Sequence, residues 1–187
     1  MIVWLNGPSG VGKATVTAEL CRRAPRARAF DAERIGWVLQ RTAGLLRPAL
    51  PSKSGVRPGD YRDLPAWRAA TVAAAARQAR GADPLLVPMT MLRRGHLEEI
   101  LGALRDRGHE VRHVLLDVSA PALVERVEAD DGPDARGWRL EDLGAYLTAR
   151  RDLRPLGAVI DTDELYPDEV ADALEDLIKG WRAPSGT

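Results

Sequence analysis

The 187-residue sequence contains few of the residues that build several common kinds of site. Its single cysteine excludes an internal disulfide and a cysteine metal cluster. The three histidines, His96, His109 and His113, are scattered, and we expect them to be surface or packing residues. Lys plus Arg and Asp plus Glu each number 27, so the zero net charge argues against nucleic-acid binding.

Long hydrophobic runs are also missing: no stretch approaches the ~20 apolar residues of a membrane-spanning helix. The first apolar run begins at residue 2 and reads as a strand, so we expect no secretion signal. We therefore expect a cytoplasmic protein with no transmembrane segment. The composition, 45% hydrophobic and 29% charged, is typical of one globular domain over 1–187. Nothing in it indicates an oligomeric state.

The most specific pattern lies at the N-terminus, where an apolar run, a Gly-rich loop and a helical pattern follow one another. Glycines in such a loop let successive backbone N–H groups point at one anion, beside the positive end of the helix. Lys13 then reaches the β- and γ-phosphates of a nucleotide. A Gly-rich turn without a ligand is the alternative interpretation. The motif predicts an ATP site made by Gly7, Ser9, Gly10, Val11, Gly12, Lys13, Ala14 and Thr15.

Position 14 departs from the usual motif. A Ser or Thr generally follows the lysine, and its hydroxyl ligates Mg²⁺, but here the residue is Ala14. We therefore expect no metal site made by the protein alone. Mg²⁺ is expected to be held mainly by phosphates and water, and Thr15 to contact the α-phosphate.

Strand-like and helix-like patterns alternate along the whole chain. Strands are predicted at 2–5, near 30, at 85–87, at 111–118 and at 157–160. The alternation predicts an α/β fold, a P-loop nucleoside-kinase-like three-layer sandwich with a five-stranded parallel sheet and helices on both faces. Residues 44–60, rich in Pro and Gly, are predicted to form a mobile loop on the acceptor side, and 130–154 a lid region whose helix starts near Glu141.

Ligands of such folds bind at the carboxyl ends of the strands. Asp31 ends the strand that we expect beside the first one, so its carboxylate is a candidate base for a substrate hydroxyl or a ligand of Mg²⁺ through water. The alternative is a cap of the following helix. Arginines are frequent over 126–154, and we expect at least one to close over the phosphates. Arg136 and Arg139 are the candidates, and an arginine-rich surface is the alternative.

A few aromatic residues flank the long loop. Trp37 and Tyr61 are expected to stack on a ring of the acceptor, as is Trp67, for which helix packing is an equal alternative. Further substrate-binding candidates are Arg68, Met89 and Thr90.

Several segments of the chain resemble the tunicamycin-resistance proteins, P-loop ATP-binding proteins of bacteria, and the resemblance covers most of its length. The segment LLVPMT at 85–90 is the most specific match, because Pro at the end of a buried strand is unusual. A more distant likeness is to chloramphenicol phosphotransferase, in which an Asp that Asp31 matches is the base for the drug hydroxyl. The other matching segments are 1–13, 30–39, 63–69 and 96–113, with a weaker match from 123–128 to 160–174.

The resemblance implies ATP binding and a role in resistance to tunicamycin or a related nucleoside-type antibiotic. It also implies that Arg126 lies near the adenine, and we place Thr162, after the last strand, in the same nucleotide site. The first hypothesis is phosphoryl transfer to a drug hydroxyl. The alternatives are ATP-dependent sequestration of the drug without transfer, and a nucleotide or small-metabolite kinase.

Overall fold

The computed structural model describes residues 1–44, 60–129 and 136–183, apart from the side chains of 40–44 and 136–141. Within them, one parallel sheet has the order β2-β3-β1-β4-β5. Its strands are β1 (Ile2–Asn6), β2 (Arg28–Ala29), β3 (Leu85–Pro88), β4 (Val111–Asp117) and β5 (Ala158–Asp161). The helices are α1 (Lys13–Arg23), α2 (Glu33–Gly44), α3 (Pro65–Ala79), α4 (Arg94–Arg105), α5 (Ala120–Glu128), α6 (Arg136–Leu153) and α7 (Pro167–Arg182), with short 3₁₀ turns η1 (Tyr61–Asp63) and η2 (Arg154–Leu156).

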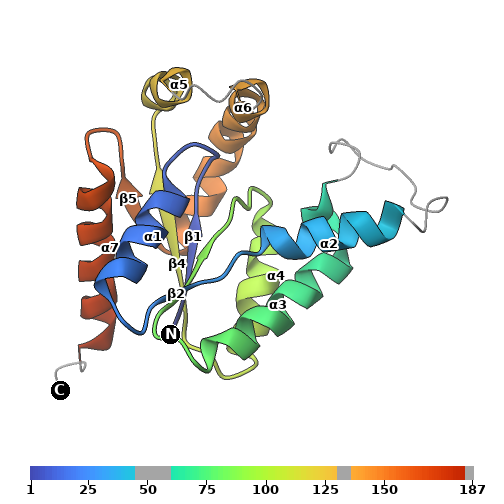
Figure 1. Cartoon of the computed structure of the whole chain (residues 1–187). Helices are drawn as coiled ribbons and strands as arrows, with labels where there is room; N and C mark the ends of the chain where they lie inside the picture. Colours follow the sequence, from blue (N-terminus) through green and yellow to red (C-terminus); the bar gives the residue numbers. More distant parts are fainter. Residues whose placement is uncertain (45–59, 130–135, 184–187) are drawn as a thin grey trace.

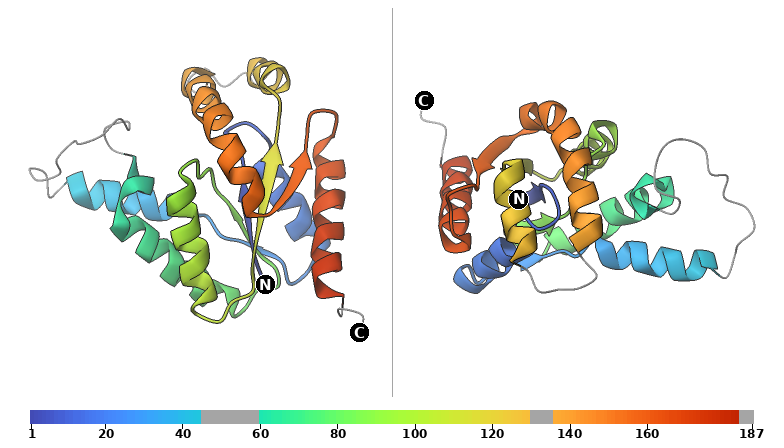
Figure 2. Two further views of the ribbon diagram at one scale, coloured as in Figure 1. Left: turned by 180° about the vertical axis from the view of Figure 1, so that it is seen from behind. Right: turned by 90° about the horizontal axis from the view of Figure 1, so that it is seen from above.

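Helices cover both faces of the sheet, as the alternating pattern predicts. Helices α1 and α7 pack together on one face, and α3 and α4 pack together on the other, with α6 beside α4 (Figures 1 and 2). Helix α5 lies above the carboxyl ends of the strands, next to α6 (Figure 1). The predicted three-layer α/β fold is therefore confirmed.

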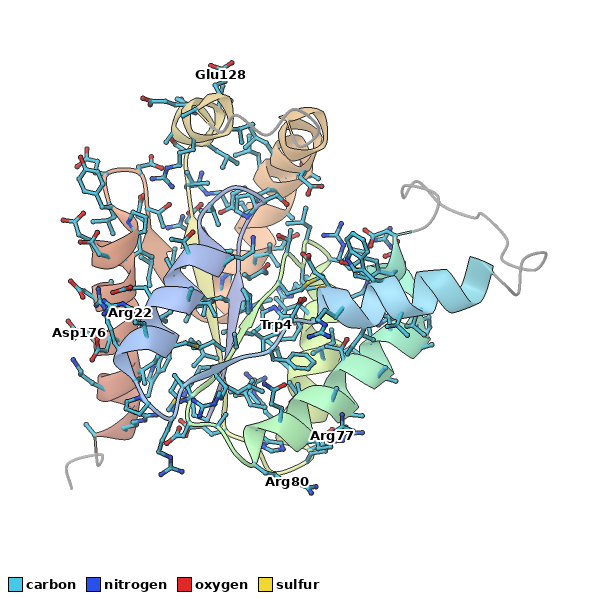
Figure 3. The ribbon with its side chains drawn as sticks, in the orientation of Figure 1. Trp4, Arg22, Arg77, Arg80, Glu128 and Asp176 are labelled. Atoms are coloured by element: carbon cyan, nitrogen blue, oxygen red, sulfur yellow. The ribbon has the colours of Figure 1, made fainter. Side chains whose placement is uncertain are left out.

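The centre of the core is β1, whose five residues are all buried because strands pair with both of its edges and helices cover both of its faces. Trp4 exposes none of its surface and lies between the helix layers, whereas Arg22, Arg77, Arg80 and Asp176 lie at the periphery (Figure 3). A strand so enclosed holds its carboxyl end, and hence the loop that follows it, in a rigid position.

One expectation about the sheet is wrong. Strand β2 has only two residues and pairs with β3, and β3 lies between β2 and β1. Asp31 therefore follows the edge strand and not a neighbour of β1. Both β2 residues are exposed, so their side chains carry no apolar pattern from which the strand order could be inferred.

The lid region also differs from the expectation. Helix α6 begins at Arg136 instead of near Glu141, so Arg136 and Arg139 belong to a helix and not to a loop. Of the acceptor-side loop predicted at 44–60, Gly44 ends α2 and Asp60 caps η1. The rest of that loop, and residues 130–135 of the lid region, lie outside the described residues.

His113 on β4 predicts a loss of stability in acid. Burial, with a smaller contribution from Arg105, lowers the pKa of His113 to about 4 in the folded protein. Because the unfolded chain then binds the proton first, the free energy of unfolding should fall as pH drops from 6.5 toward 4, by as much as ~3 kcal/mol. Urea unfolding at pH 7, 5.5 and 4.5 measures this fall. Between pH 7 and pH 4.5 the free energy of unfolding of His113→Leu should fall less than that of the wild type. Equal losses in both proteins would contradict this assignment.

Candidate functional site

The loop between β1 and α1 is the centre of the candidate site, at the carboxyl end of the sheet (Figure 1). Gly7, Gly10 and Gly12 have φ angles of 144°, 88° and 97°, which other residues rarely adopt. Gly12 is the N-cap of α1, and no side chain caps this helix. The first N–H groups and the positive end of α1 are therefore available to an anion such as a phosphate.

The turn at Gly7 is held by neighbours from two other strands. A Cβ on Gly7 would lie 2.6 Å from the carbonyl oxygen of Leu116 on β4, so the close approach requires glycine. The buried Asn6 accepts hydrogen bonds from the N–H of Gly7 and of Met91, both 2.9 Å, and donates to the Met91 carbonyl. The Thr90 hydroxyl donates to the Gly7 carbonyl at 2.9 Å. The phosphate loop is thus tied to the segment after β3.

Asn6 was missed by the sequence reasoning, although the sequence contains a signal for it. It is the one polar residue in the otherwise apolar stretch that precedes the motif. A buried amide needs hydrogen-bond partners, and here the partners are the two segments that must meet. Thr90, which we expected to contact the substrate, is instead buried and directed at the loop. Met89 is also buried, so neither side chain is open to a substrate in this structure.

Lys13 begins α1, and its Nζ donates to the carbonyls of Gly7 and Pro8 at 3.0 and 2.8 Å. Burial lowers the pKa of Lys13 to about 7, although the carboxylates of Glu33 and Asp142 act in the opposite direction. Arg62 lowers it further. The negative charge of a phosphate bound in the loop would stabilise the protonated amine and so raise its pKa.

Two carboxylates, carried by two different helices, therefore partly oppose the lowering of the Lys13 pKa. Glu33 is on the first turn of α2, and Asp142 is on α6 and accepts a hydrogen bond from the Ser9 hydroxyl at 3.0 Å. Neither residue was singled out from the sequence. Both are ordinary helical acidic residues there, and only the packing of α2 and α6 beside the phosphate loop distinguishes them.

A cleft of about 590 Å³ lies beside the phosphate loop, between α5 and the segment that joins β5 to α7. Arg126 on α5 lines it and donates to the Thr162 hydroxyl at 3.1 Å and to the Thr162 carbonyl. Asp163 accepts from the Ser119 N–H at 2.7 Å, which holds this segment to the start of α5. The cleft begins at Gly10 and Gly12, so it is placed for the base of a nucleotide whose phosphates lie in the loop.

On the acceptor side, Tyr61 packs between α2 and α3. Its ring centre is 5.4 Å from that of Trp67, and a Cβ on Gly36 would lie 2.5 Å from the Tyr61 ring. Burial, together with the charge of Glu33, raises the pKa of Tyr61 to about 12, so its hydroxyl stays protonated. Trp37 is 65% exposed, which leaves its indole accessible to an acceptor ring.

Two other acceptor-side candidates are turned into the protein. Trp67 is fully buried, and its indole N–H donates to the Ala32 carbonyl at 3.1 Å. Arg68 is buried too; it pairs with Glu99 at 2.7 Å and donates to the carbonyls of Arg62 and Asp63. Trp67 thus supports Tyr61, and Arg68 fixes the turn that carries it.

Arg62, which the sequence did not single out, lies between the acceptor side and the phosphate loop. Its guanidinium is paired with Asp60 through two nitrogens and donates to the Thr90 carbonyl at 3.0 Å. These contacts keep the pKa of Arg62 above its ordinary value despite burial. Arg62 therefore remains a fixed positive charge close enough to Lys13 to act on it.

Asp31 is exposed and caps α2, with Oδ1 accepting from the N–H groups of Glu33 and Arg34 at 3.0 and 3.3 Å. The capping alternative is thus the role that the structure displays. Both of these bonds use Oδ1, and capping is compatible with a second role for Oδ2.

Helix α6, in the region predicted to form a lid, is attached to the sheet through Asp117, the last residue of β4. Asp117 is buried and accepts hydrogen bonds from the Tyr146 hydroxyl, from Arg150 at 3.0 Å and from Arg154. Burial and the Asp117 carboxylate raise the pKa of Tyr146, so this hydroxyl keeps its proton. The side chains of Arg136 and Arg139 lie outside the description, and their backbone forms the first turn of this anchored helix.

The residues present fit a nucleotide with its metal ion. The open N-terminus of α1 suits the phosphates, and Ala14 and Thr15 are exposed beside it. No group of three or more His, Cys, Asp or Glu with a described side chain is placed to hold a metal by itself. Carboxylate and phosphate oxygens together are nevertheless ligands that Mg²⁺ takes, and the carboxylates of Glu33 and Asp142 lie near enough to the loop to act on Lys13.

Comparison with known families decides the relationship. A family model described as an AAA domain matches residues 2–136. The chain belongs to this AAA domain family. It is a nucleotide-binding P-loop protein with a kinase-like fold. No curated protein matches the chain significantly.

Solved structures support the resemblance. The tunicamycin resistance protein of Deinococcus radiodurans is 27% identical with a TM-score of 0.68, over 95% of this chain and 94% of that one. A sugar kinase of Janibacter sp. HTCC2649 is 17% identical, with a TM-score of 0.63 over 95% and 94%. Shikimate kinase of Acinetobacter baumannii, in complex with shikimate, is 17% identical, with a TM-score of 0.63 over 98% and 95%. The last two likenesses concern the fold alone.

The described part of the chain has no helix of the length and apolar character that crossing a membrane requires.

The lowered pKa of Lys13 predicts that the protein takes up protons when it binds a nucleotide. At pH 8 an amine with a pKa of about 7 is largely neutral, and phosphates should restore its ordinary, protonated state. Calorimetric titration with a non-hydrolysable ATP analogue at pH 8, in buffers of different ionisation enthalpy, should show uptake of close to one proton. Lys13→Met should abolish most of it. Equal uptake by the variant would assign the proton to another group.

Proposed function

We propose that this protein is an ATP-dependent phosphotransferase that acts on a hydroxyl group of tunicamycin or a related nucleoside-type antibiotic. The main support is the position of Lys13 between two sides of the site. Its ammonium belongs to the phosphate loop, and Glu33 acts on it from α2, the helix that Asp31 caps. The end of the nucleotide phosphates would thus face the acceptor side. The 27% identity to a tunicamycin resistance protein over 95% of this chain supports the choice of drug.

In this proposal the acceptor hydroxyl oxygen forms a bond to the γ-phosphorus, the bond from that phosphorus to the bridging oxygen breaks, and ADP leaves. Asp31 takes the hydroxyl proton on Oδ2, since Oδ1 is engaged in capping. Lys13 holds the γ-phosphate and offsets its charge as the transfer proceeds. Mg²⁺ bound to the phosphates would supply further charge compensation.

The acceptor would be bound by the exposed Trp37 and the protonated Tyr61. Flat apolar surface and a hydroxyl donor suit a base or sugar ring better than a charged group. Arg126 and Thr162 would bind the nucleotide in the cleft beside α5. Arg136 and Arg139, on the first turn of α6, are proposed to approach the phosphates when the lid closes.

A second candidate, sequestration of the drug without transfer, is favoured by two positions. Ala14 removes the hydroxyl that would hold Mg²⁺ against the phosphates. Thr90, after β3, stands where an acidic residue would assist transfer, and its hydroxyl is engaged by the Gly7 carbonyl. Under this alternative ATP would bind and the drug would leave unchanged.

Mass spectrometry of tunicamycin incubated with the protein, Mg²⁺ and ATP tests the proposal. A product heavier by one phosphoryl group should form, and Lys13→Ala should abolish it. Asp31→Asn should reduce transfer ~100-fold or more with little change in ATP affinity, because Asn also caps helices well. Glu98→Gln, on the exposed face of α4, is a matched control and should leave transfer unchanged.

Unmodified drug in every reaction would overturn the phosphotransferase proposal for tunicamycin. Drug titrations with and without ATP would then decide for sequestration if affinity depends on ATP. Transfer retained in Asp31→Asn would overturn the assignment of Asp31 as the base.

A further inference from the structure

The phosphate loop, which lacks a metal-binding hydroxyl at position 14, is contacted by a carboxylate from another element. Ala14 lies on the first turn of α1. From α6, Asp142 reaches the same loop and accepts a hydrogen bond from Ser9 at 3.0 Å, with only 9% of its surface exposed. Because Ser9 lies within the Gly7–Gly12 loop, the Asp142 carboxylate lies against the structure that would hold the nucleotide phosphates.

The placement of Asp142 is enforced from the other end of its helix. Tyr146, one turn further along α6, is fully buried and donates to Asp117 on β4. Arg150 and Arg154 bind the same carboxylate. The helix is therefore fixed against the sheet, and Asp142 is held toward Ser9 by the same face.

The Asp142 carboxylate should weaken the binding of a nucleotide that carries no metal ion. Asp142 and Glu33 are both near enough to Lys13 to act on its ammonium. Lys13 and Arg62 attract triphosphate oxygens in the loop, but the two carboxylates repel them, and this repulsion is stronger in a partly buried site than in water. A divalent cation between carboxylate and phosphates would turn this repulsion into attraction, and Mg²⁺ is typically bound by one or two carboxylates together with substrate phosphates.

We propose that Asp142, from α6, takes the place of the hydroxyl missing at Ala14 and holds the divalent cation of the bound nucleotide, directly or through water, together with Glu33 from α2. The site consists of the phosphates, Asp142 and Glu33. Nucleotide and metal ion then bind with strong mutual dependence. The proposal rests on nucleotide binding at the phosphate loop and is independent of transfer to any drug.

Calorimetric titration with the non-hydrolysable analogue AMP-PNP, in excess Mg²⁺ and in EDTA, measures this dependence as a ratio of dissociation constants. The wild type should bind at least roughly tenfold more tightly with Mg²⁺. Asp142→Asn, of the same size, should bring the ratio close to one, both by weakening the complex with Mg²⁺ and by tightening the complex without it. The double variant Asp142→Asn with Ala14→Ser should recover much of the ratio.

Asp152→Asn is the matched control, because it removes the same charge from an exposed position of α6 and should leave the ratio unchanged. If Asp142→Asn does not fold, Asp142→Ser serves, since it removes the carboxylate and keeps a hydroxyl near Ser9. Paramagnetic resonance of Mn²⁺ gives a second readout: the wild-type complex with AMP-PNP should bind Mn²⁺ several-fold more tightly than the variant complex.

A ratio in Asp142→Asn within twofold of the wild type would overturn the proposal. Tighter binding of AMP-PNP by the same factor with and without Mg²⁺ would also overturn it, because Asp142 would then act only as a competing anion on the loop. Neither result involves the drug, so this test and that of the phosphotransferase activity fail separately.

Discussion

The arrangement of the whole site depends on one close approach, that of Gly7 to the Leu116 carbonyl where the chain leaves β1. No Cβ fits there, so the backbone turns directly over β4 and delivers the loop to the start of α1. Asn6 and Thr90 then bind this turn to the segment after β3. Three adjacent strands, β3, β1 and β4, thereby fix the position of the phosphate cradle, and loop flexibility contributes little to it.

Two aspartates, Asp117 on β4 and Asp142 on α6, join α6 to the sheet and to the phosphate loop. Asp117 belongs to the sheet and binds side chains of the helix, whereas Asp142 belongs to the helix and binds the loop. A displacement of α6 would have to break a buried carboxylate network as well as the Ser9 contact, and unpaired buried charges are costly. Any closing movement over the phosphates is therefore coupled to β4 through Asp117.

The sequence predicts the features that depend on local pattern, and it misses those that depend on which elements meet. The glycine spacing indicates the phosphate loop, and the apolar runs indicate the strands, because both arise from neighbouring residues. The place of β2 at the sheet edge could not be read from two exposed residues. Trp67 and Arg68 resemble ligand contacts in the sequence, and only the packing of α3 against Ala32, Glu99 and η1 shows them to be internal. Asp142 carries no local signal at all, since only its contact with Ser9, far away in the sequence, distinguishes it.

In the absence of a nucleotide, the lowered pKa of Lys13 would make this lysine chemically reactive. An amine with a pKa of about 7 is about half unprotonated at neutral pH, and an unprotonated amine is a nucleophile. Because the other two lysines of the chain are Lys53 and Lys179, and Lys179 is exposed with a raised pKa from its Glu175 hydrogen bond, an acylating reagent at neutral pH would distinguish Lys13 from Lys179. A nucleotide bound in the phosphate loop would return Lys13 to an ammonium ion and end that reactivity. The nucleotide would therefore protect from acylation the lysine that binds it.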